Sequence, residues 1–63
     1  MRFDDETLDR FRVLAPPEAF RAAKHAVWAA GPVGSEDFLD IYEQLIEEGI
    51  LTRDQIEEFD ERL

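Results

Sequence analysis

The sequence contains no cysteine and few side chains that could act as nucleophiles: one serine, one histidine and two threonines. Without cysteine it forms neither a disulfide nor a cysteine-based zinc site, which is consistent with a reducing cytoplasm. Nucleophilic catalysis needs a nucleophile with a base beside it. Ser35 and Thr52 stand where helix caps are expected, and His25 falls toward a polar helix face. We therefore predict no catalytic residue and no enzymatic activity.

Long apolar runs are also missing. No stretch approaches the 18 residues of a membrane-spanning helix, and residues 1–20 lack a basic segment followed by an apolar one. We expect a cytoplasmic protein that neither spans a membrane nor carries a signal peptide.

Motifs that hold metals or phosphates are absent too. The acidic clusters at residues 4–6 and 57–61 lack the alternating acids and glycine of a calcium loop. The Glu-x-x-His pattern of carboxylate metal sites fails because Ala22 stands three residues before His25. Residues 31–34 read as a connector rather than a phosphate-binding loop. We predict no metal site and no cofactor.

What the sequence does contain is a strong excess of acidic residues. Its 63 residues carry 16 acids against seven Lys and Arg, giving a net charge of −9, yet 44% are hydrophobic and five are Phe. That is enough apolar material for one small core, so we predict a single folded domain over residues 1–63.

The charge is segregated along the chain. Residues 1–9 sum to −3, residues 10–31 to +3 and residues 32–63 to −9. Nucleic-acid backbones and anionic membranes repel such a chain, whereas basic protein surfaces attract it. We expect a protein partner, with no direct binding to nucleic acid or membranes.

The C-terminal half predicts a helical hairpin. Apolar residues recur at helical spacing over residues 35–48, Gly49 suits the left-handed position that ends a helix, and Thr52 with Gln55 forms a capping box for a second helix. In that second helix Ile56, Phe59 and Leu63 form the apolar stripe.

The N-terminal half predicts two further helices. Asp4 or Asp5 can cap the first, in which Leu8, Phe11 and Ala15 share a face, although residues 10–14 also alternate like a strand.

Pro16 and Pro17 end that element, and Pro17 suits the first position of a helix that runs to Ala30 and stops at Gly31 and Pro32. Small and apolar residues form its buried stripe: Ala19, Phe20, Ala23, Ala26, Val27 and Ala30. The predicted fold is all-α, a compact bundle of four short helices with a C-terminal helical hairpin.

The predicted core draws on all four helices. Its members are Leu8, Phe11, Phe20, Val27, Phe38, Tyr42, Leu45, Ile46, Ile56 and Phe59.

Two surface features are candidates for binding a partner. One side of the third helix carries an apolar arc, which includes Leu39. The opposite side carries acidic and amide side chains, among them Gln44, and no basic residue. The candidate binding residues on this side and its extension are Glu36, Asp40, Glu43, Glu47 and Glu57.

The second feature is Trp28, on the flank of its helix shared with Lys24 and Arg21. It suits either the edge of the core, with Lys24 across its ring, or an aromatic anchor in an interface.

The residues Gly49-Ile50-Leu51-Thr52, with Gln55 and Ile56 following, resemble the signature of SHOCT domains, which are short C-terminal helical hairpins. Gln55 and Ile56 replace the Glu and Phe usual in that family, and the resemblance covers about a third of the chain. It implies a packing or oligomerisation module.

The profile of the whole chain leads to another hypothesis. A small, acidic chain without catalytic motifs resembles phage-encoded inhibitors that imitate DNA, including anti-CRISPR proteins. Acids spaced one helical turn apart can imitate a phosphate strand and occupy the basic surface of a nucleic-acid-handling protein. The alternatives are a helical interaction module, which could form homo-oligomers, and an acidic face that is only solvated.

Overall fold

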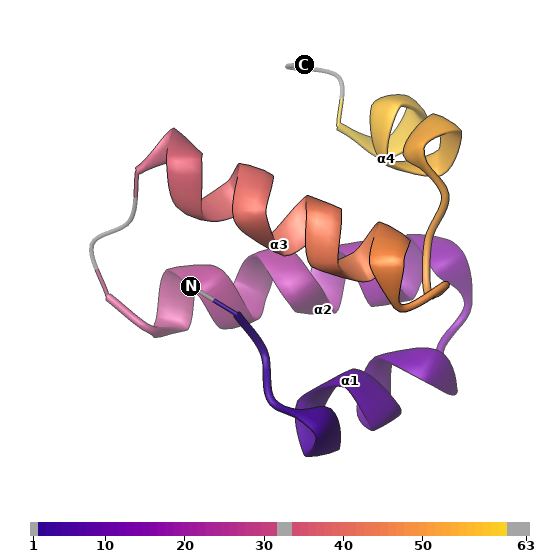
Figure 1. Ribbon diagram of the computed structural model, residues 1–63, viewed down its shortest axis with the longest axis horizontal. Coiled ribbons are helices and arrows are strands. Elements are labelled where there is room, and N and C mark those ends of the chain that lie inside the picture. Colours follow the sequence, from indigo (N-terminus) through magenta and orange to yellow (C-terminus); the bar gives the residue numbers. More distant parts are fainter. Residues whose placement is uncertain (1, 32–33, 61–63) are drawn as a thin grey trace.

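Four α-helices make up the structure, a computed structural model that describes residues 2–31 and 34–60 (Figure 1). They are α1 (Asp5–Arg12), α2 (Pro16–Ala29), α3 (Ser35–Glu47) and α4 (Arg53–Phe59). The predicted all-α fold is confirmed. The described residues form no strand, and the segment that also alternated like a strand is helical up to Arg12 and then turns.

Two of the helices start at an N-cap residue whose side chain accepts a hydrogen bond from a backbone N–H. Asp4 caps α1, where its carboxylate accepts a hydrogen bond from the Thr7 backbone N–H at 2.9 Å. Hydrogen bonding to Thr7 favours the charged form and lowers the pKa of Asp4 below its ordinary value. This contribution to stability is therefore complete above the ordinary aspartate pKa and is lost as the pH falls through the lowered one. At α4, Thr52 and Gln55 form the predicted reciprocal capping box, at 3.1 and 2.9 Å.

The starts of α2 and α3 differ from the prediction by one residue. Ser35 is the first residue of α3 rather than its cap; Gly34 takes the cap position, and its N–H donates to the Asp37 carboxylate at 3.2 Å. The Asp37 carboxylate thus supplies the side-chain hydrogen bond at the start of this helix, where the Ser35 hydroxyl was expected to supply one. In α2, Pro16 comes first and Pro17 second, because extended Ala15 already satisfies the constraint that proline places on its predecessor.

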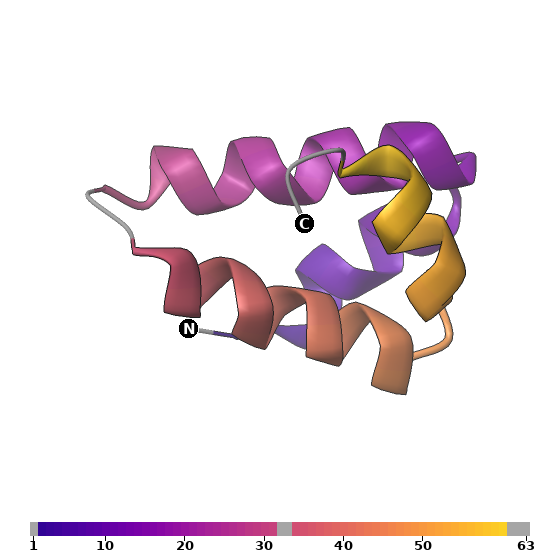
Figure 2. The same cartoon turned by 90° about the horizontal axis from the view of Figure 1, so that it is seen from above.

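α2 is the centre of the arrangement, since it packs against each of the other three helices. Figure 2 shows α2 and α3 lying side by side as two layers, with α4 crossing near one end. The turn that joins α3 to α4 is a Schellman motif: the N–H of Ile50 bonds to the carbonyl of Leu45 at 3.0 Å, and the N–H of Gly49 to that of Ile46 at 3.1 Å. Gly49 has the expected positive φ, 72°.

All ten predicted core residues lie in the core. Seven are buried, while Phe38, Ile46 and Phe59 are partly buried against them. Ala19 and Ala23 are almost fully buried, and such small side chains allow a neighbouring helix to approach closely.

Three apolar residues were wrongly expected to face inward: Ala15, Ala30 and Leu39 are exposed. The two alanines lie at the helix ends, where no neighbouring helix covers them, and Leu39 lies on the rim of the arc that α3 buries. The predicted stripe residue Leu63 and the predicted stop at Pro32 fall outside the described residues.

Gln44 was placed on the polar side of α3, but it is buried, with 4% of its surface exposed. Its amide oxygen accepts the Phe3 N–H at 2.7 Å and its amide nitrogen donates to the Phe3 carbonyl at 2.9 Å. The Phe3 ring meets Phe11 edge to face, with centroids 5.1 Å apart. This side of α3 is covered because Gln44 satisfies both backbone groups of the residue that covers it.

Replacing Leu45, which is fully buried, by Ala should lower the free energy of unfolding by about 2–5 kcal/mol, because a cavity is left in the core. Leu39→Ala on the same helix is the matched control and should change it by less than about 0.5 kcal/mol, since Leu39 is 52% exposed. Chemical denaturation measures both. Equal losses would contradict the burial described here.

Gly49→Ala should destabilise the protein by about 1 kcal/mol through backbone strain at a positive φ. The effect is conformational only, because an added Cβ meets no atom within 4 Å. Gly49→Asn is the control: asparagine tolerates the left-handed region, so its loss in a thermal melt should be smaller. An alanine variant as stable as the parent would refute the strained turn.

Candidate protein-binding surface

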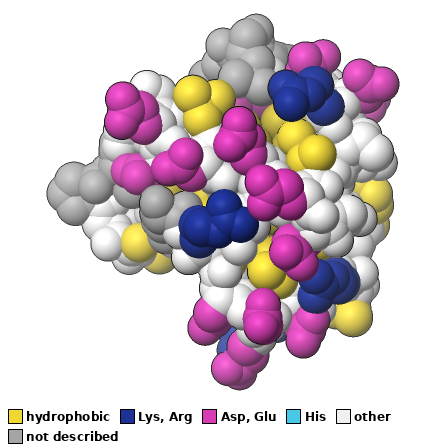
Figure 3. Space-filling view, in the orientation of Figure 1, with side chains coloured by type: hydrophobic (Ala, Val, Ile, Leu, Met, Phe, Trp, Pro, Cys, Tyr) yellow, Lys and Arg dark blue, Asp and Glu magenta, His cyan; other side chains and the backbone are white. Residues whose placement is uncertain are grey.

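The acidic candidates on α3 form one row, here called the acidic ridge: Glu36, Asp40, Glu43 and Glu47. Their spacing of four, three and four residues confines them to an arc of roughly 60° on the helix surface. All four are exposed, because Ile41 and Leu45 on the opposite side of α3 are fully buried in the core. Figure 3 looks onto this face and shows acidic side chains crossing it, with a few basic side chains among them.

Arginines from the N-terminal segment neutralise one end of the acidic ridge. Arg2 pairs with Glu47 at 3.2 Å, and Arg12 pairs with the neighbouring Glu48 at 2.6 Å. Both acids lie at the C-terminus of α3, where the helix dipole disfavours negative charge. The sequence of α3 alone does not predict these two ion pairs, because the paired residues lie 45 and 36 positions apart in the chain.

The rest of the acidic ridge differs from this end. Within residues 2–31 and 34–60, Glu36 and Glu43 make no ion pair. Glu36 and Glu43 therefore keep charges that no ion pair within the described residues offsets, whereas Arg2 offsets that of Glu47.

Glu57 comes from α4 and lies across a hollow of about 290 Å³ whose lining also includes Glu43 and Arg53. A smaller hollow, of about 220 Å³, is lined by Arg53 together with Glu43 and Glu47. The structure thus brings Glu57 beside the acidic ridge, as an extension from a second helix, and places one arginine at the junction.

Trp28 lies away from the acidic ridge, on α2. It is 53% exposed, its ring meets Phe38 edge to face at 6.0 Å, and the Lys24 ammonium lies 5.3 Å from its centroid. The expected packing of Lys24 across the indole is confirmed, and Lys24 also lies over Phe20 at 5.4 Å.

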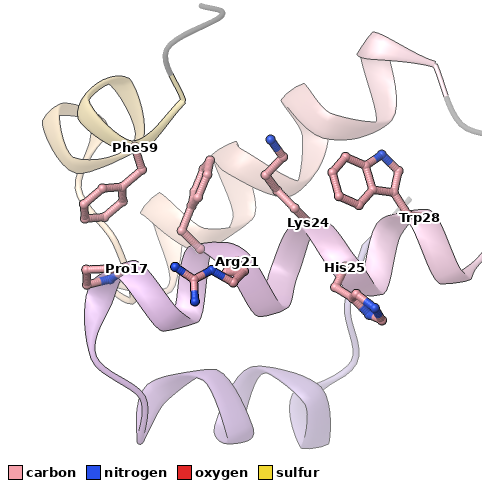
Figure 4. A pocket seen from close by; sticks show the side chains of 7 residues that line it. Pro17, Arg21, Lys24, His25, Trp28 and Phe59 are labelled. Atoms are coloured by element: carbon pink, nitrogen blue, oxygen red, sulfur yellow. The ribbon is translucent and has the colours of Figure 1, made fainter.

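Trp28 lines two hollows. One of about 340 Å³ connects it with Phe38 and Leu39 of α3. The other, of about 360 Å³, follows α2 past Lys24 and Arg21 to Phe59 (Figure 4). The structure therefore places Leu39, an exposed apolar side chain, between the acidic ridge and the indole.

Asp60 is a buried acid that the sequence pattern did not single out. It follows the last turn of α4, is 9% exposed, and accepts a hydrogen bond from the Tyr42 hydroxyl at 2.7 Å. This bond ties the end of α4 to the middle of α3. A polar residue just beyond a helix gives no periodic signal of burial.

Other kinds of site find no support in the described part of the chain. No group of three or more His, Asp or Glu side chains there could hold a metal ion. None of the four helices is long and apolar enough to cross a membrane, as far as the described residues extend.

Comparison with protein-family models gives no match. Comparisons with curated proteins and with solved structures give no match either. The resemblances to SHOCT hairpins and to DNA-imitating inhibitors stay predictions.

Tyr42→Phe should lower the free energy of unfolding by about 1–3 kcal/mol, because buried Asp60 loses the hydroxyl that donates to it. The phenylalanine ring keeps the stacking with Phe20, whose centroid is 5.7 Å away. In a double-mutant cycle with Asp60→Asn, the two losses should not add, because they act on one contact. Additive losses would show that the hydroxyl and the carboxylate act independently.

Proposed function

We propose that this domain binds a basic surface of another protein through the acidic ridge, and that it thereby blocks the contacts of that protein with nucleic acid. The observation that carries the proposal is the exposed, four-member row of carboxylates on a helix whose other side is held in the core. Its role is binding rather than catalysis, in the cytoplasm, where nucleic-acid-handling proteins work.

The spacing of the acidic ridge suits this role. Neighbours on it are one helical turn apart, about 5–6 Å, so four carboxylates extend over roughly 16 Å. The charges of a nucleic-acid strand follow one another at a comparable spacing. A cleft with arginines and lysines placed for phosphates can therefore accept a rigid acidic helix in their place.

Two further features favour a protein partner over a merely solvated face. Like charges one turn apart destabilise a helix, so a chain selected only for solubility would intersperse signs along this row. Leu39 lies exposed beside the ridge, and an apolar anchor flanked by polar groups is the usual composition of a protein interface. The profile shared with anti-CRISPR proteins supports the same reading, and the partner would then be a basic component of a nuclease complex.

The variant Glu36→Gln/Glu43→Gln tests the proposal on the two ridge residues that have no ion pair in the described part of the chain. Affinity for a basic partner should fall about five- to thirtyfold at moderate salt, because each exposed charge pair contributes about 0.5–1 kcal/mol. The loss should shrink at high salt. Stability should change little, because the relief of like-charge repulsion offsets the lost interaction of Glu36 with the helix dipole.

The matched control is Glu18→Gln/Glu58→Gln, which removes the same two charges from exposed positions on α2 and α4. The partner is captured from cell lysate on the immobilised domain, identified and then titrated against all three proteins. Duplex DNA in excess should release it from the wild type. A partner that binds both double variants equally, or that duplex DNA does not displace, would refute imitation of nucleic acid.

A further inference from the structure

α2 presents an outward row with the same spacing as the acidic ridge but with the opposite charge. Pro17, Arg21, Lys24 and Trp28 follow one another at intervals of four, three and four residues; we call this row the basic ridge. It lines a hollow of about 360 Å³ together with Phe20, His25 and Phe59 (Figure 4). The hollow thus combines cationic groups with aromatic walls.

Neither cation of the basic ridge forms an ion pair within residues 2–31 and 34–60. Arg21 is exposed and, across residues 2–31 and 34–60, it has no acidic partner. The Lys24 ammonium is held over the rings of Phe20 and Trp28, which fixes its position without neutralising its charge. The only acid of α2, Glu18, lies about 60° round the helix from Arg21, outside the row.

The two ridges belong to two different helices of the molecule. α3 lies in front of α2 in the view of Figure 1, and Figure 2 shows the two helices as separate layers. Along that viewing direction the Cα atoms extend over only 18 Å. The acidic row and the basic row therefore lie on separate helix layers of the domain and are equal in length.

We propose that the basic ridge binds the acidic ridge of a second copy of this chain, so that copies associate head to tail. The spacing of four, three and four residues reads the same in both directions. In either relative orientation of the helices, the two bases at the centre of one row therefore face Asp40 and Glu43 of the other. Pro17 and Trp28 at the ends then meet the stems of Glu36 and Glu47 and exclude water from the charges between them.

The net charge of −9 opposes association. The repulsion between whole domains acts over a longer distance than the attraction between facing side chains of the two ridges. At physiological ionic strength the Debye length is about 8 Å, shorter than the separation between the centres of stacked domains 18 Å thick. Contacts between facing side chains at a few ångströms are screened far less. Because the contact joins two different ridges, it is heterologous and leaves one ridge of each copy free for a further copy.

Sedimentation velocity on the purified chain, without any partner, tests this proposal. At about 0.15 M salt the mean mass of the wild type should rise continuously with concentration, and at about 1 M salt the rise should vanish. The double charge swaps Arg21→Glu/Lys24→Glu and Glu36→Lys/Glu43→Lys should each weaken association more than about thirtyfold. An equimolar mixture of the two variants should associate again, because the unchanged acidic ridge of the first variant can bind the unchanged basic ridge of the second.

The second variant separates the ridges from net charge. Glu36→Lys/Glu43→Lys carries less negative charge than the wild type, so association governed by net repulsion would increase in it, whereas association through the ridges decreases. A wild type that stays monomeric up to about 1 mM, or a mixture that associates no better than its components, overturns the proposal. Circular dichroism monitors folding, and Arg21→Glu with Glu43→Lys repeats the mixing test with single substitutions at exposed positions.

The outcome of this self-association test does not depend on whether the proposed function is correct. Arg21→Glu/Lys24→Glu leaves the acidic ridge intact, so its affinity for a basic partner should match or exceed that of the wild type. Loss of self-association with partner binding retained supports both proposals. Partner binding by a strictly monomeric wild type would overturn only the head-to-tail contact.

Discussion

The packing of α2 against its neighbours is the interaction on which the rest of the domain depends. A chain of 63 residues removes only about 60% of its unfolded surface from water, so few side chains can be spared from the core. Ala19 and Ala23 let the other helices approach α2 closely, and Val27, Ile41 and Leu45 fill the space between them with no exposed surface. Full burial of each larger side chain contributes about 1.5–3 kcal/mol. Both ridges inherit their rigidity from this contact, because the inner sides of α2 and α3 form it.

The fold also shows how a strongly acidic chain limits its own repulsion. Negative charge suits the start of α3, where Glu36 and Asp37 lie near the positive end of the helix dipole. It does not suit the end, and there Arg2 and Arg12 arrive from the N-terminal segment. Compensation thus lies where the helix dipole disfavours negative charge, while Glu36 and Glu43 form no ion pair within the described residues. That distribution favours a surface shaped for a partner over an evenly solvated one.

Local signals in the sequence predicted most of the fold. Proline pairs, glycines and capping residues located the starts of the four helices to within a residue, and apolar spacing identified the ten core residues and the acidic ridge. Contacts between distant residues could not be predicted in this way. Gln44 has the spacing of a surface residue until Phe3 covers it, Asp60 lies beyond the last helical turn, and Arg2 meets Glu47 only after folding. Apolar periodicity describes one helix at a time, so it does not predict which residues pack against that helix.

The bond between Gln44 and Phe3 has a consequence for the order in which the domain assembles. Helical domains fold rapidly because most of their contacts join residues near in sequence, whereas this pair spans 41 positions. From this separation we expect the N-terminal segment to dock after the helices have formed. By the same argument, we expect this segment to detach first in native-state fluctuations. Its departure would expose one edge of the Phe11 ring and would free the Glu47 carboxylate from Arg2 at the C-terminal end of the acidic ridge.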